Sequence, residues 1–194
     1  MNKREMLKIG ALAATLPWQA RAANAPARGG PGLLTLAGAI AHGNRSALNP
    51  VSDQLMLKHG AKFDKAWQFD AAMLSRLPAL TIAPTLEYDS QPHRLSGPLL
   101  STVAEAAGVA AGAAAMLGLR ALDGYTIALS LADARAYRMI VAHTLDGMPL
   151  SIGGLGPLWA VIDADRVTPF KDKPLKERFG LCPWGLYFID VTAA

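Results

Sequence analysis

The chain has 194 residues, of which 52% are hydrophobic, and it carries a formal net charge of +4. This length suits one domain with its own hydrophobic core, and the single cysteine, Cys182, excludes an internal disulfide and a multi-cysteine metal cluster. Most of the positive charge lies in the first 22 residues, which leaves about +1 for the rest of the chain. A nucleic-acid-binding function, which needs a clustered basic face, therefore loses its main support.

An export signal is predicted over residues 1–22. The segment has a basic start, an apolar stretch over Ile9–Trp18 and a small-x-small pattern that ends at Ala22. This layout is typical of export signals, and the apolar stretch is too short to span a bilayer. We expect cleavage after Ala22, with Ala25 as the alternative, and a periplasmic mature protein without a transmembrane segment. The competing interpretation, a frayed helix of a cytosolic protein, leaves this order of charge, apolar residues and small residues unexplained.

The export route stays open. The letters "NKREMLK" resemble the twin-arginine export motif, although a lysine replaces its first arginine and a methionine its aromatic residue. The apolar stretch is rich in Ala and Gly, which suits that route. General export of an unfolded chain is the alternative.

The first elements of the mature chain are weakly patterned. Residues 23–32 are rich in Gly, Pro and Ala, which predicts a flexible lead-in before a single domain over 33–194. Residues 33–40 (LLTLAGAI) predict a first strand, and 42–65 is polar and irregular. A short extended piece then ends at Phe69.

Two helices are predicted in the middle of the chain. Asp70 is a good N-cap for the helix that follows, which Pro78 ends before a strand over 79–86. The clearest helix is 98–107, with its proline in the first turn and Gly108 as its C-terminal cap. Its apolar face is expected to carry Leu99, Leu100, Val103, Ala106 and Ala107. Its polar face is expected to carry Ser101, Thr102 and Glu105.

The C-terminal half predicts mainly strands. Residues 116–122 and 125–131 flank an Asp-Gly turn, and 139–152 predicts a hairpin around a second Asp-Gly turn. A buried strand is expected within 153–163 and a final strand over 184–191. We expect the aromatic residues Trp159, Trp184 and Tyr125 to be core residues. Several strands with few short helices predict an α+β fold with a mixed β-sheet.

Four pieces of this half also resemble a known family in their order and spacing. They are "SGPLLSTVAEAAG", "ALDGYTIALSLADA", "IVAHTLDGMPLSIGGLGPLWAVI" and "WGLYFIDV". Together they resemble the molybdopterin-binding domain of the sulfite-oxidase-like oxidoreductases, over about residues 95–191. The resemblance implies that domain's fold, a link to oxidoreduction and the molybdenum cofactor, and the family includes exported bacterial members.

The sequence departs from this family at the cofactor site. In catalytically competent members, a cysteine just before the first of these pieces supplies the thiolate that binds molybdenum. The corresponding stretch here, 85–100 (TLEYDSQPHRLSGPLL), contains no cysteine, and imidazole or carboxylate does not replace a soft thiolate. Two basic residues of the family are Trp159 and Pro183 here. We expect Cys182, far from the expected position, to be a buried apolar residue.

The resemblance and the departures together leave three functions open, and whether the chain is an enzyme stays open with them. The first is a non-standard molybdopterin-binding-domain-like protein that binds pterin or another anion, or serves a redox or sensory partner. The second is an active molybdenum-dependent oxidoreductase whose pterin is held without a protein thiolate. The third is a cofactor-free interaction protein that keeps only the fold.

The candidate cofactor-binding residues are Tyr88, His93 and Arg94. Arginine can hold a phosphate or carboxylate with two hydrogen bonds, and a protonated histidine adds another donor. A solvated loop is the competing interpretation. The other histidines, at 42, 59 and 143, lie at unrelated spacings, so no metal site is predicted.

A basic loop is the candidate docking surface for a redox or sensory partner. Its positive residues are Arg166, Lys171, Lys173, Lys176 and Arg178. Local positive potential attracts acidic partners and phosphate groups. A solvated charged loop without a partner is the alternative.

Overall fold

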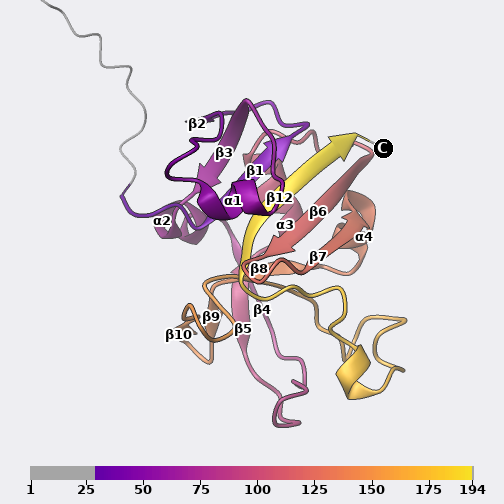
Figure 1. The fold of residues 1–194 in the computed structure, drawn as a ribbon. Coiled ribbons are helices and arrows are strands. Elements are labelled where there is room, and N and C mark those ends of the chain that lie inside the picture. The colour runs from indigo at the N-terminus through magenta and orange to yellow at the C-terminus, as the bar shows by residue number, and fades with distance from the viewer. Residues whose placement is uncertain (1–28, 194) are drawn as a thin grey trace, which may run out of the picture.

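The computed structural model describes residues 29–193, so the predicted export signal and most of the lead-in lie outside the described part. The largest sheet has six strands in the order β2-β3-β1-β12-β6-β7 (Figure 1). Its strands are β1 (Leu34–Gly38), β2 (Arg45–Ser46), β3 (Lys65–Phe69), β6 (Ala115–Ala121), β7 (Thr126–Ser130) and β12 (Leu186–Ala193). Strand β1 pairs in parallel with β12, and the other pairs are antiparallel. The α+β class and the mixed sheet are therefore confirmed.

The remaining strands form two smaller, separate sheets. One has the order β10-β9-β5-β4, and the other pairs β11 with β8. Their strands are β4 (Ala79–Ile82), β5 (Leu95–Pro98), β8 (Ile140–Ala142), β9 (Thr144–Leu145), β10 (Met148–Pro149) and β11 (Trp159–Val161). Asp146 and Gly147, between β9 and β10, have φ angles of 49° and 83°. Positive φ at both central residues is typical of a type I′ turn, so the predicted Asp-Gly hairpin is confirmed.

The helices are short. They are α1 (Gln54–Lys58), α2 (Ala71–Ser75), α3 (Leu100–Ala106), α4 (Leu131–Ala136) and a 3₁₀ turn, η1 (Leu175–Glu177). Asp70 caps α2 as predicted, since its carboxylate accepts a hydrogen bond of 2.7 Å from the backbone N–H of Met73. No helix within residues 29–193 has the length and apolar character needed to cross a membrane.

The structure corrects the start and one face of the clearest predicted helix. Pro98 ends strand β5, where it pairs with Ala79 of β4, and the helix begins two residues later at Leu100. Pairing with a neighbouring strand thus outweighs the local preference of proline for a first helical turn. Ser101, predicted on the polar face, is buried. Neighbouring elements therefore cover more of the helix surface than the predicted apolar face.

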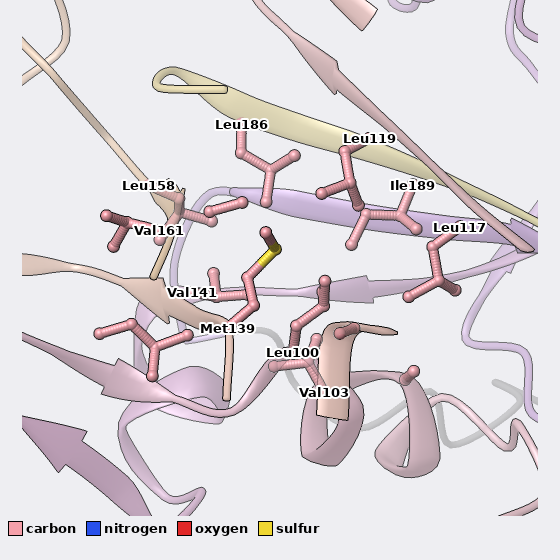
Figure 2. Packing of buried hydrophobic residues seen from close by; sticks show 14 of the residues in the cluster. Leu100, Val103, Leu117, Leu119, Met139, Val141, Leu158, Val161, Leu186 and Ile189 are labelled. Carbon is pink, nitrogen blue, oxygen red and sulfur yellow. The ribbon is translucent and has the colours of Figure 1, made fainter. Parts of the chain in front are cut away.

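In the core, side chains of α3 meet those of the largest sheet and of the small β8–β11 sheet. Figure 2 shows Leu100 and Val103 of α3 directed toward Leu117, Leu119 and other apolar side chains of both sheets. Close packing also acts on the backbone at Gly97 of β5. A Cβ atom there would lie 1.9 Å from a carbonyl oxygen of β8, so only glycine fits without a shift of the strands.

Candidate functional site

One cavity gathers chemically distinctive side chains from four separate segments, and we call it the aromatic pocket. It has a volume of about 280 Å³. Its polar and aromatic lining includes Glu87 and Tyr88 from the β4–β5 connection, Asp123 and Tyr125 from the β6–β7 turn, and Lys176 and Trp184 from the segment before β12. Trp159 of β11 and Cys182 also contribute to its wall.

Three large aromatic side chains at this cavity are exposed to solvent. The exposed fractions are 58% for Tyr88, 48% for Tyr125 and 41% for Trp184. Exposed apolar faces that converge on one cavity are typical of a ligand site and not of ordinary surface. The prediction that Trp184 and Tyr125 are core residues is therefore wrong, whereas Trp159 is buried as predicted.

Hydrogen bonds fix the wall of the aromatic pocket. The Tyr125 hydroxyl donates to the carbonyl oxygen of Gly180 at 2.7 Å, and the Trp159 indole N–H donates to the carbonyl oxygen of Cys182 at 2.9 Å. The backbone N–H of Ala160 also donates to the carbonyl oxygen of Pro183 at 3.1 Å. The segment that carries Trp184 is thus held against β11 and against Tyr125, the residue before β7, so the cavity is largely formed before a ligand arrives.

The charged groups of the pocket are mostly acidic. Among residues 29–193, the lining includes two carboxylates, Glu87 and Asp123, and one cation, Lys176, and none of the three has an ion-pair partner within 4.0 Å. Partial burial raises the pKa of Tyr88, and the neighbouring Glu87 carboxylate raises it further. The Tyr88 hydroxyl therefore stays protonated at neutral pH, and the pocket offers more hydrogen-bond acceptors than cations.

Cys182 is part of the pocket wall, but its thiol is unreactive there. The residue is only 4% exposed, which confirms the prediction that it is buried. Burial raises the pKa of the thiol to about 12, so the group is neutral at physiological pH. A neutral buried thiol is neither a nucleophile nor a metal ligand.

The structure separates the three predicted cofactor-binding residues. Tyr88 lines the aromatic pocket, whereas His93 and Arg94 lie outside it. The His93 ring is held between two carboxylates, at 2.6 Å from Asp146 and 2.8 Å from Asp89, and we call this group the His93 clasp. The backbone N–H of Arg94 also donates to Asp146 at 2.8 Å. Because both ring nitrogens of His93 have partners, a bound anion would have to displace a carboxylate.

The His93 clasp perturbs all three of its titratable groups. Asp146 and then Asp89 raise the pKa of His93, and hydrogen bonds from His93 lower the pKa of each aspartate. The raised histidine pKa means that its contribution to stability is complete below the ordinary value of 6.5 and is lost as pH rises through the raised value. The lowered aspartate pKa values give a contribution that is lost on acidification.

The basic loop does not present its charges on one face. Arg178 forms an ion pair with Asp165 at 2.7 Å, and Lys173 lies over a phenylalanine ring. Lys176 lines the aromatic pocket, and Arg166 lines a different cavity. The loop is thus divided between two cavities.

The remaining histidines take structural positions. His59 lies 2.8 Å from the hydroxyl of Tyr187, His42 lies against Trp67, and burial lowers the pKa of His143. Within residues 29–193, no group of three or more His, Cys, Asp or Glu side chains is placed to hold a metal ion. The sequence matches no family model and no curated protein, so the chemistry of the aromatic pocket carries the functional argument.

Proposed function

We propose that this chain is an exported ligand-binding module on a molybdopterin-binding-domain-like scaffold. It holds a planar nitrogen heterocycle of the pterin type in the aromatic pocket and is not a self-sufficient enzyme of the sulfite-oxidase type. The observation that carries the proposal is the convergence of three exposed aromatic rings and two carboxylates on one cavity. The resemblance adds support, because the loop that carries Tyr88 and the two departures, Trp159 and Pro183, all border this cavity.

The chemistry of a pterin ring complements these side chains. Its flat face stacks on aromatic rings such as Tyr88 and Trp184, in the way that nucleic-acid bases stack on aromatic side chains. Its amino group and ring N–H are hydrogen-bond donors, and the carboxylates of Glu87 and Asp123 are acceptors. Stacking thus supplies affinity, and the two carboxylates select ligands with donor edges.

The complete molybdenum cofactor fits these residues poorly. Molybdenum favours a soft thiolate, whereas the one thiol in the pocket wall is buried with a pKa of about 12. The cofactor's phosphate calls for cationic groups, whereas among residues 29–193 only Lys176 brings a lysine or arginine side chain to the pocket wall. We therefore derive no redox step and assign the pocket to a pterin without metal.

Titration of the full-length chain with neopterin, followed by calorimetry, tests the proposal. We expect saturable binding at one site. Stacking on one aromatic side chain contributes about 1–3 kcal/mol, so Trp184→Ala should weaken binding by about 5- to 150-fold. Met148→Ala is the matched control, because this exposed apolar residue lies in the β9–β10 hairpin and does not line the pocket.

Metal analysis of protein purified from cells that make the cofactor completes the test. We expect molybdenum far below one atom per chain. Molybdenum near one atom per chain would instead support the oxidoreductase without a protein thiolate. Absence of both neopterin binding and molybdenum would support the cofactor-free interaction protein.

A further inference from the structure

The connection between β4 and β5 is a hairpin-like arm that carries one wall of the aromatic pocket. We call residues 83–94 the β4–β5 arm, and Figure 1 shows it extending away from the largest sheet. Its two sides are joined near the tip, where the backbone N–H of Leu86 donates to the carbonyl oxygen of Gln91 at 2.9 Å. Glu87 and Tyr88 lie within this closed tip and line the pocket. Contacts that hold the arm in place therefore hold this wall of the pocket.

Both sides of the β4–β5 arm are fastened to other segments. On the first side, the backbone N–H of Thr85 donates to the Asp165 carboxylate at 2.7 Å. On the returning side, the His93 clasp joins the arm to the β9–β10 turn, since Nδ1 of His93 lies 2.6 Å from Oδ2 of Asp146. Nε2 of the same ring lies 2.8 Å from Oδ2 of Asp89, near the tip. One histidine thus connects the base of the arm, its tip and the neighbouring turn.

Only the protonated form of His93 can donate to both carboxylates. A carboxylate offers acceptors alone, and a neutral imidazole has a single N–H, so an uncharged ring would turn one nitrogen lone pair toward an aspartate. Among residues 29–193, Asp146 from the turn and Asp89 from the arm raise the pKa of the ring, and Arg94 beside it acts on Asp146. Both contacts therefore persist below the raised pKa of His93, and one is lost as pH rises through it.

We propose that His93 is a positioning residue for the aromatic pocket. Protonated His93 closes the clasp between Asp146 and Asp89. Because Asp89 directly follows Tyr88 in the chain, the closed clasp holds the Tyr88 ring and the Glu87 carboxylate in the pocket wall. This inference rests on the proposed function, since it concerns control of the same pterin-type ligand. His93 acts through the arm and not by touching the ligand, and binding should weaken as pH rises.

Calorimetric titration of the full-length chain with neopterin, from about pH 5 to about pH 9, tests this role. Affinity should fall by about two- to fivefold as pH rises through the pKa of His93, a modest change because exposed ion pairs contribute little. His93→Gln removes the cation and should bind weakly throughout the range. His93→Arg keeps a cation at every pH and should bind tightly throughout. Ionisation of neopterin or of a pocket side chain would affect all three chains alike.

His42→Gln is the matched control. This histidine is exposed, and its ring lies 3.2 Å from the carbonyl oxygen of Ala106 and outside the aromatic pocket. The variant should keep the pH profile of the parent chain. Circular dichroism of each variant establishes that it is folded.

Two NMR measurements on the parent chain complete the test. Ligand and proton favour the same closed arm, so saturation with neopterin should raise the pKa of His93. Without ligand, the Leu86 amide should lose protection from hydrogen exchange above the pKa of His93 in the parent chain, but not in His93→Arg.

The outcomes separate this inference from the proposed function. If neopterin binds at no pH, the proposed function is lost, and protection of the Leu86 amide that follows His93 still supports its positioning role. The inference is overturned if the parent chain and His93→Gln bind neopterin with the same pH profile. It is equally overturned if neopterin leaves the pKa of His93 unchanged, or if protection of the Leu86 amide does not depend on His93.

Discussion

The reactivity of Cys182 offers the sharpest test of whether this chain can present a thiolate. At pH 8, a thiol with a pKa of about 12 is ionised in about one molecule in ten thousand, whereas a cysteine with the ordinary pKa of 9.0 is ionised in about one in ten. Alkylation proceeds through the thiolate, so the folded chain should react with iodoacetamide about a thousandfold more slowly than the chain unfolded in urea. Burial of the sulfur slows the folded chain further.

The labelling rate reports on Cys182 alone, because the chain has one cysteine. Mass spectrometry of timed samples gives the labelling rate in buffer and in urea, and Cys182→Ser gives the background from other nucleophiles. Labelling of the folded chain within about tenfold of the unfolded rate would refute the reasoning. It would mean that the thiol is accessible and ionised, and Cys182 would return as a candidate ligand for a soft metal.

Three further predictions concern the scaffold. Gly97→Ala should lower the free energy of unfolding by about 1–3 kcal/mol or more in urea titrations, because the new Cβ would overlap a carbonyl oxygen of β8. Gly112→Ala is the control and should change this free energy little, because a Cβ at Gly112 would have no atom within 4 Å. Equal effects of the two substitutions would contradict the packing at Gly97. Asp146→Asn should lower the pKa of His93 in NMR titrations, because it removes the first of two carboxylates that raise this pKa; an unchanged pKa would show that the His93 clasp does not form in solution. Asp70→Ala should reduce stability by about 0.5–2 kcal/mol through loss of the α2 cap, and thermal melts that match the parent chain would exclude this role.

Local patterns were enough to predict much of the fold. The alternation in 125–131 is reproduced by the buried residues Ile127 and Leu129 of β7, and the Asp-Gly pair at Asp146 forms the predicted turn. These signals lie within a few residues of the chain and do not depend on distant contacts. Strand β5 was missed because its residues, which include Gly97 and Pro98, have low strand propensity. They form a strand because β4 and β9 flank them.

The candidate site was predicted only in part, for the same physical reason. The sequence predicts Tyr88 as a binding residue because it lies in a polar cluster. It predicts Trp184 and Tyr125 as core residues because each adjoins an apolar strand. Tyr125 precedes β7 by one residue, so strand alternation no longer fixes its direction. Asp146 was predicted only as a turn residue, although its carboxylate contacts His93, 53 positions earlier. Contacts at that separation leave no local pattern in the sequence.

The position of β12 determines when this molecule can complete its structure. The strand lies between β1 and β6, so residues 186–193 join a segment near residue 35 to one near residue 118. Until residues 186–193 are in place, the two halves of the largest sheet have no common neighbour, and each presents an open edge. A partly folded chain without this strand therefore exposes two unpaired strand edges, which are templates for aggregation.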